Sequence, residues 1–175
     1  MKKKNHLVSL ILTAIFTALT VVLSRFFSIN VWNMSIGFSF VSVMLCGMLL
    51  GPVWGGICGA LADFIGALLF PFGPYFPGFT ATAFLSGAIF GIIGLVARKN
   101  YSRIRFIGFS VLLVVLKETV CSVVLNTYFI LVLYGGEFIP LMLSRLPISL
   151  VTLILEIALA IVLKEVIIKR FNREL

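Results

Sequence analysis

The chain has 175 residues, of which 61% are apolar and only 11% are charged, and its formal net charge is +8 at pH 7. A soluble domain carries roughly 25% charged residues, so this composition excludes a soluble globular fold and indicates a protein embedded in a membrane. The positive charge alone would also suit nucleic-acid binding. However, all lysines and arginines except Arg25, Lys117 and Arg145 lie in three short segments beside apolar runs, as expected for a membrane protein.

The apolar runs predict six membrane-spanning helices. The first, residues 7–23, has about the length of a span and no small-x-small cleavage site at its end, so we expect a spanning helix rather than a signal peptide. The last two exceed the roughly 20 residues that a span needs, and we expect them to tilt or project from the bilayer. The last is predicted to be interrupted at residues 145–147. The predicted spans are residues 7–23, 36–50, 53–69, 79–97, 104–134 and 138–168.

The basic residues orient these spans. Six spans place both termini on one side together with all three basic segments, and the positive-inside rule makes that side cytoplasmic. Five or seven spans would leave one basic segment on the wrong side. The sequence therefore predicts an all-α integral membrane protein in which residues 1–175 form a single six-helix domain with both termini cytoplasmic. The basic segments are residues 2–4, 98–105 and 164–173, and the outer connections are residues 24–35, 70–78 and 134–137.

The segment of residues 51–79 combines three features that suggest a binding function. Gly51, Gly55 and Gly59 are four residues apart, so on a helix they share a face and permit close packing with a neighbouring helix. Asp63 follows, and a lone carboxylate in a membrane helix is costly unless it faces the protein interior or a wet cavity. The end of the segment is rich in proline, glycine and aromatic residues, so we expect a stiff outer loop there.

Charged residues within the spans are candidate functional residues, because charge is expensive in a membrane. Arg25 and Arg145 are the strongest candidates, since both are expected near the outer surface and a guanidinium suits a carboxylate ligand. Snorkelling to lipid head groups is the alternative. Lys117 and Glu118 are adjacent, so on an α-helix we expect their side chains to diverge by about 100° and not to pair. We expect Glu156 to be structural and leave the role of Lys117 open.

Aromatic and amide side chains concentrate on the same predicted outer side. An aromatic belt at the membrane interface explains some of them. A small-molecule pocket with aromatic walls and a few polar groups explains better why they gather in two loops. The residues are Phe26, Phe27, Trp32, Asn33, Phe70, Phe72, Tyr75, Phe76, Phe79, Asn126, Tyr128 and Tyr134.

No motif predicts catalysis. The three cysteines lie inside apolar runs without metal-ligand spacing, and the sequence contains no G-x-x-x-x-G-K-[ST] motif for ATP hydrolysis. We therefore predict that the protein is not an enzyme and has no catalytic residues, metal site or cofactor. A secondary transporter would need paired coupling charges or an inverted repeat, which the sequence does not show. The outer arginines and aromatic loops disfavour a purely structural membrane subunit.

Over its whole length the chain resembles the substrate-binding S component of an energy-coupling factor (ECF) vitamin transporter. The length, the six helices and an A-x-x-x-A motif at Ala14 and Ala18 carry this resemblance. Within the family the chain is most similar to the folate-specific type. The features behind that similarity are Gly51-Pro52 with Gly55, Gly59 and Asp63, the run Pro71-x-Gly73-x-Tyr75-Phe76-Pro77-Gly78-Phe79-Thr80, the run Asn126-Thr127-Tyr128, and Arg145.

The resemblance implies a function and partners. Such a subunit captures a vitamin, here folate, outside the bacterial cytoplasmic membrane. It then docks through the face of Ala14 and Ala18 onto a transmembrane coupling subunit that carries two ATPase subunits. An S component for pantothenate remains the near alternative, although pantothenate has one carboxylate and no ring, and would make less use of the aromatic side chains.

The chemistry of folate assigns expected roles to the candidate residues. Arg25 and Arg145 would meet the two carboxylates of its glutamate, aromatic side chains would stack on its rings, and Asp63 or Asn126 would meet the N–H groups of the pterin. The expected substrate-binding residues are Arg25, Trp32, Asn33, Asp63, Tyr75, Phe76, Thr80, Asn126, Tyr128 and Arg145.

Overall fold

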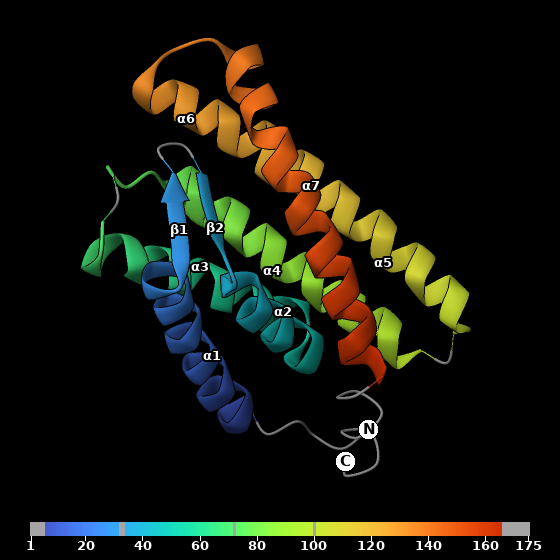
Figure 1. The fold of residues 1–175 in the computed structure, drawn as a ribbon. Helices are drawn as coiled ribbons and strands as arrows, with labels where there is room; N and C mark the ends of the chain where they lie inside the picture. Colours follow the sequence, from blue (N-terminus) through green and yellow to red (C-terminus); the bar gives the residue numbers. More distant parts are fainter. Residues whose placement is uncertain (1–5, 32–33, 72, 100, 166–175) are drawn as a thin grey trace.

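The computed structural model describes residues 6–31, 34–71, 73–99 and 101–165, and this part of the chain is mostly helical with one short β-hairpin (Figure 1). One continuous rod, residues 103–134, consists of α5, the π-helical segment η1 and α6. The elements are α1 (His6–Phe26), β1 (Ser28–Val31), β2 (Met34–Gly37), α2 (Ser39–Leu50), α3 (Pro52–Leu69), α4 (Pro77–Arg98), α5 (Arg103–Lys117), η1 (Glu118–Leu125), α6 (Asn126–Tyr134) and α7 (Phe138–Leu163).

Helical segments lie at all six predicted positions, and within the described ranges five of them are long and apolar enough to cross a membrane. These five are α1, α3, α4, the rod of residues 103–134 and α7, so the protein is a multi-pass membrane protein. The remaining helix, α2, is apolar but has only 12 residues. At about 1.5 Å per residue it is ~18 Å long, which is shorter than the roughly 30 Å hydrocarbon core of a bilayer.

The chain between α1 and α2 differs from the prediction. The sequence predicts a helix from residue 36, but Met34–Gly37 form strand β2, and α2 begins only at Ser39. Strand β2 pairs antiparallel with β1, with Ser28 opposite Gly37. The predicted boundary is wrong because a short apolar run cannot be assigned to helix or strand by its hydropathy alone.

The predicted interruption of the last helix at residues 145–147 is also wrong. Helix α7 runs without a break from Phe138 to Leu163 and contains Pro147 in its interior. Proline lacks the N–H that would bond to the preceding turn, but membrane helices tolerate it where neighbouring groups satisfy the freed carbonyl. As a result, Arg145 lies within a regular helix rather than in a loop.

Helices α3 and α4 pack closely because glycines stand at their contact. A Cβ atom added to Gly87 would lie only 2.1 Å from the carbonyl oxygen of Gly55, and one added to Gly59 would lie 2.4 Å from that of Ala83. The predicted small-residue face is therefore confirmed at Gly55 and Gly59. Gly51 serves the chain differently: it joins α2 to α3 with a φ of 107°, which glycine adopts without steric cost.

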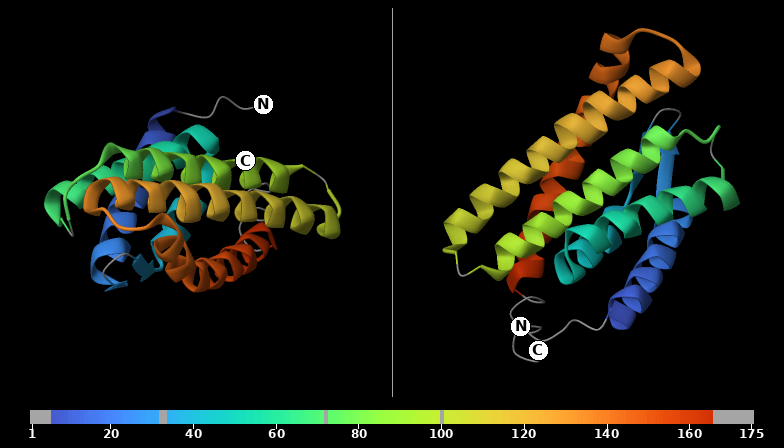
Figure 2. Two further views of the ribbon diagram at one scale, coloured as in Figure 1. Left: turned by 90° about the horizontal axis from the view of Figure 1, so that it is seen from above. Right: turned by 180° about the vertical axis from the view of Figure 1, so that it is seen from behind.

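Helix α4 lies between two groups of helices, with α1, α2 and α3 on one side and the rod of residues 103–134 on the other (Figures 1 and 2). The beginning of α1, the α4–α5 connection and the end of α7 lie at one end of the bundle. The hairpin, the α3–α4 connection and the α6–α7 connection lie at the other end. The three predicted outer connections therefore share one end.

Candidate functional site

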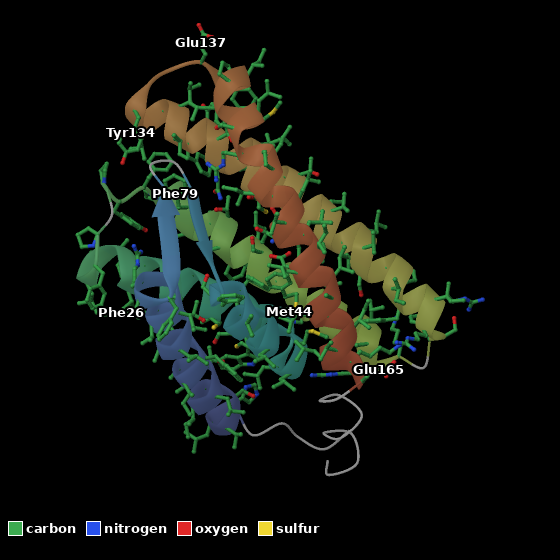
Figure 3. The ribbon with its side chains drawn as sticks, in the orientation of Figure 1. Phe26, Met44, Phe79, Tyr134, Glu137 and Glu165 are labelled. Atoms are coloured by element: carbon green, nitrogen blue, oxygen red, sulfur yellow. The ribbon has the colours of Figure 1, made fainter. Side chains whose placement is uncertain are left out.

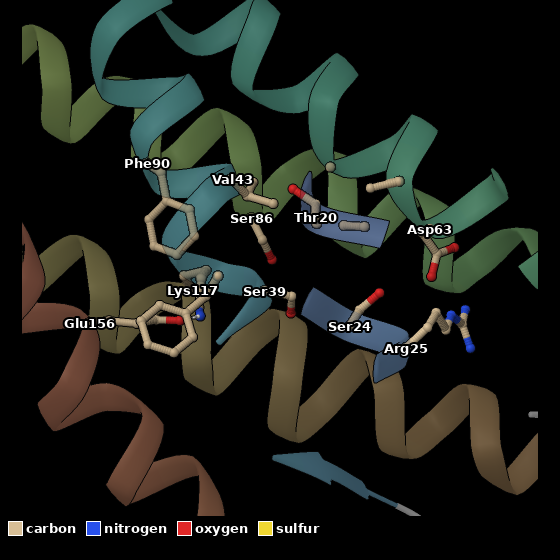
Figure 4. A pocket seen from close by; sticks show the side chains of 14 residues that line it. Thr20, Ser24, Arg25, Ser39, Val43, Asp63, Ser86, Phe90, Lys117 and Glu156 are labelled. Carbon is tan, nitrogen blue, oxygen red and sulfur yellow. Dashed lines mark hydrogen bonds and ion pairs between the residues drawn. The ribbon is translucent and has the colours of Figure 1, made fainter. Parts of the chain in front are cut away.

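A cavity of about 350 Å³ lies among α1, α2, α3 and α4, and side chains of α5 and α7 line one part of it (Figure 4). Its volume falls within the roughly 300–1,000 Å³ that small-molecule sites occupy. Eight of its lining side chains are polar, which is expensive in a membrane domain unless they serve a ligand or one another. The charged ones are Arg25, Asp63, Lys117 and Glu156, and those with hydroxyl groups are Thr20, Ser24, Ser39 and Ser86.

Arg25 and Asp63 form one charged end of the cavity. Arg25 lies in the last turn of α1 and against Gly66 of α3, where a Cβ atom would come within 2.9 Å of its guanidinium. Asp63 also belongs to α3 and interacts electrostatically with Arg25. Its Oδ2 also accepts a hydrogen bond of 2.7 Å from Thr80, whose hydroxyl lies 3.1 Å from that of Tyr75. The carboxylate thus joins α1, the start of α4 and the α3–α4 connection.

Lys117 and Glu156 form the other charged end, at the opposite side of Figure 4. The Lys117 ammonium donates to Glu118 and to Glu156, with both N–O distances 2.5 Å. The three side chains are only 6%, 4% and 1% exposed, respectively. The ammonium also lies 5.2 Å from the centre of the Phe90 ring, which favours a cation over its face.

The expectation that Lys117 and Glu118 do not pair is wrong. Both residues keep α-helical φ and ψ where α5 meets the π-helical segment η1, so their side chains do leave the helix in different directions. They pair nevertheless, because the long lysine stem lets its ammonium reach back to the adjacent carboxylate. Short π-helical segments are frequent at functional sites, which agrees with the position of this one beside the cavity.

The charges that line the cavity are balanced, with two cations and two carboxylates. Such a site suits a polar ligand that carries both an acidic group and hydrogen-bond donors. A family model described as "ECF-type riboflavin transporter, S component" matches residues 4–169 of the chain. The chain belongs to this family of ECF-type S components. The family consists of transport components rather than enzymes, and this confirms the predicted class of protein.

Individual relatives of the S component are folate transporters. The folate transporter FolT of Clostridium novyi (strain NT) is 34% identical over 147 residues, which cover 83% of this chain and 80% of the relative. The FolT of Leuconostoc mesenteroides is 35% identical over 82 residues, 47% of this chain and 44% of the relative. A crystal structure of FolT bound with folic acid superposes with a TM-score of 0.77 at 31% identity, covering 90% of this chain and 92% of that one.

The structure of the S component brings some of the predicted site residues together. Arg25 and Asp63 line the cavity, and Thr80 and Tyr75 join them through hydrogen bonds. Phe76 does not line the cavity and packs its ring against Phe79 and Phe129. Trp32 and Asn33 lie outside the described residues.

Three other predicted residues do not line this cavity. Asn126 accepts a hydrogen bond of 2.8 Å from Thr82. Tyr128 is 52% exposed. Arg145 is buried in α7, where it interacts electrostatically with Glu118, and its Nε and Nη1 have no hydrogen-bond partner in the described part of the chain. Their roles in ligand binding stay predictions.

Sequence reasoning missed the hydroxyl groups of the cavity and left Lys117 unassigned. One signal was present: Thr13, Thr17, Thr20 and Ser24 are three or four residues apart and so share one face of α1. A polar stripe on an otherwise apolar membrane helix indicates the face that is turned inward. Thr20 and Ser24 of this stripe line the cavity, and Thr13 and Thr17 are buried.

Proposed function

We propose that this S component binds folate from outside the cell and delivers it for ATP-driven import. Its curated relatives are FolT proteins, and the matched crystal structure contains folic acid. The observation that carries the proposal is Arg25 in the cavity, because a guanidinium there can receive a carboxylate of the folate glutamate.

Riboflavin is the second candidate, since the description of the matching family names it. Riboflavin has no carboxylate, so it would leave Arg25 without a charged ligand group. Pantothenate has one carboxylate but no ring to fill the space beside Phe90. Folate has both a carboxylate for Arg25 and rings for the space beside Phe90.

A binding titration tests the proposal. The detergent-solubilised protein is titrated with folic acid, riboflavin and pantothenate, and small molecules that co-purify with it are identified by mass spectrometry. We expect folic acid to bind at least about 100-fold more tightly than the other two, a difference of roughly 2.7 kcal/mol. Tighter binding of riboflavin or pantothenate would leave the family membership intact and overturn the substrate.

We further propose that residues 1–175 form one domain that crosses the bacterial cytoplasmic membrane six times, with α2 as the short crossing and both termini in the cytoplasm. The positions of Glu137 and Glu165 at opposite ends of the bundle support this arrangement (Figure 3). Arg103, which pairs with Glu165, marks the end that we assign to the cytoplasm.

Cysteine labelling of intact cells tests the topology. The three native cysteines are buried, so an introduced cysteine gives the main signal. We expect Glu137→Cys to react with a membrane-impermeant maleimide in intact cells, and Arg103→Cys to react only after lysis. The reverse pattern, or reaction of both before lysis, would exclude six crossings with cytoplasmic ends.

Docking onto a transmembrane coupling subunit with two ATPase subunits is also part of the proposal. Ala14 and Ala18 are exposed on one face of α1, which supports a role in contact with a partner. A face of small residues lets another helix approach closely, and a bulky side chain blocks it.

We expect Ala14→Trp or Ala18→Trp to lower folate uptake by at least about 10-fold in cells that also express the coupling subunits. Folate binding to the isolated S component should stay within about twofold, because the cavity lies on the other side of α1. Ala158→Trp, at an exposed position of α7, is the matched control and should leave both measurements unchanged. Parallel loss of binding and uptake would mean that the α1 face packs inside the protein.

A further inference from the structure

We propose that Glu156 and Lys117 recognise the pterin ring of folate by its 2-amino-4-oxo edge, and so make the site selective for pterins over flavins. This inference rests on the proposed function and adds the orientation of the ligand to it. It gives a role in ligand binding to the charged end of the cavity that lies opposite Arg25.

The first support is an unused acceptor. Glu156 lines the cavity and is 1% exposed, yet its Oε2 has no hydrogen-bond partner among the described residues. A buried carboxylate oxygen without a partner is costly, so such oxygens in native proteins call for a ligand or an ordered water. Its other oxygen, Oε1, accepts from Lys117 and keeps a second lone pair.

The second support is an unused donor. A lysine ammonium has three N–H donors, and Lys117 directs one to Glu118 and one to Glu156. The third makes no hydrogen bond within the part of the chain that the structure describes, although the ammonium lies against the Phe90 ring. Lys117 also lines the cavity, so acceptor and donor stand side by side at its wall.

A pterin edge matches this pair. Its 2-amino group and N3–H are two adjacent donors, which suit the two oxygens of a carboxylate, and its 4-oxo group is an acceptor beside them, which suits an ammonium. A flavin has an oxo group where the pterin has the 2-amino group. That oxygen would face the Glu156 carboxylate, and two acceptors without a proton between them repel each other.

The charges of this end also fix the direction of the ligand. Glu118 and Glu156 already accept from the Lys117 ammonium, so a carboxylate of the folate glutamate would compete with both of them for that cation. The tail is therefore expected at the other end, beside Arg25. The Phe90 ring, which is buried and lines the cavity, offers an apolar wall for the flat pterin.

Asp63 is the other carboxylate of the cavity and the competing pterin partner. It already accepts a hydrogen bond from Thr80 and faces the Arg25 guanidinium, which would compete with the ligand's N–H groups. Glu156 Oε2 is a fully buried acceptor without a hydrogen-bond partner among the described residues, and Glu156 is more deeply buried than Asp63. The structure therefore favours Glu156.

The test compares folic acid with its 2-deamino-2-oxo analogue, which carries an oxo group in place of the 2-amino group and keeps the same aminobenzoyl-glutamate. Both are titrated into the wild type, Glu156→Gln, Asp63→Asn and the exposed control Glu137→Gln. We expect the wild type and the control to prefer folic acid by about 10- to 100-fold, the effect of hydrogen bonds to a charged group. In Glu156→Gln the amide can donate to the 2-oxo group, so the preference should fall to within about threefold, whereas Asp63→Asn should retain it.

Several results would overturn the inference: no preference in the wild type, equal weakening of both ligands in Glu156→Gln, or loss of the preference in Asp63→Asn. A thermal unfolding scan identifies a variant that does not fold. In that case Glu156→Asp, which keeps the charge but shortens its reach, takes its place and is expected to lower the preference. If the wild type does not bind folic acid at all, the proposed function fails instead, so the two failures are distinguishable.

Discussion

Replacement of Arg25 by alanine is expected to weaken folate binding by about 10- to 150-fold. A hydrogen bond to a charged group contributes about 1.5–3 kcal/mol, and each 1.4 kcal/mol is a factor of about ten in affinity. Arg25 lines the cavity and stands beside Asp63, so its loss leaves that end without a cation for the glutamate tail. Calorimetric titration of folic acid into the wild type and the variant measures the effect.

Pteroate provides the control, because it is folate without the glutamate. We expect pteroate to bind the wild type more weakly than folic acid does. Its affinity should change little in Arg25→Ala. Arg103→Ala, on the exposed far end of the bundle, should change neither ligand. Equal weakening of pteroate and folic acid would show that Arg25 holds the fold rather than the tail. The same comparison with Arg145→Ala tests the second predicted partner of the glutamate.

Replacement of Lys117 by methionine is expected to destabilise the protein by about 3–5 kcal/mol. Removal of one partner from a buried ion pair leaves an uncompensated buried charge, which costs that amount in other proteins. Here two carboxylates, Glu118 and Glu156, share the one ammonium, and all three side chains are buried. The free energy of unfolding in mixed micelles measures the loss.

The exposed pair of Arg103 and Glu165 is the matched control within the same chain. Its N–O distance is 3.4 Å and its side chains are 69% and 48% exposed. Exposed ion pairs contribute about 0.2–1 kcal/mol, so Arg103→Met should cost no more than that. Neutralising both glutamates in the Lys117→Met background, by Glu118→Gln and Glu156→Gln, should restore part of the lost stability. A Lys117→Met variant as stable as Arg103→Met would show that water reaches the cluster and screens its charges.

Much of the fold could be predicted from the sequence alone. Hydropathy predicted six positions at which the described part of the chain is helical, because an apolar helix of sufficient length leaves a continuous run of apolar residues. The spacing of Gly55 and Gly59 predicted a close helix contact, since residues four apart share a helix face. Arg25 and Asp63 were identified as candidate ligands because isolated charges in a membrane are costly unless they have a function.

The tertiary structure decided what local pattern cannot encode. The strand Met34–Gly37 exists because a second strand pairs with it, and α7 continues through Pro147 without a break. Lys117 and Glu156 are 39 positions apart in the chain, and only the packing of two helices brings them together at one cavity. Hydropathy and spacing report which residues share a face of their own helix. Which face of which other helix they meet depends on the rotation and register of both helices, and these are set by the side-chain packing of the whole bundle.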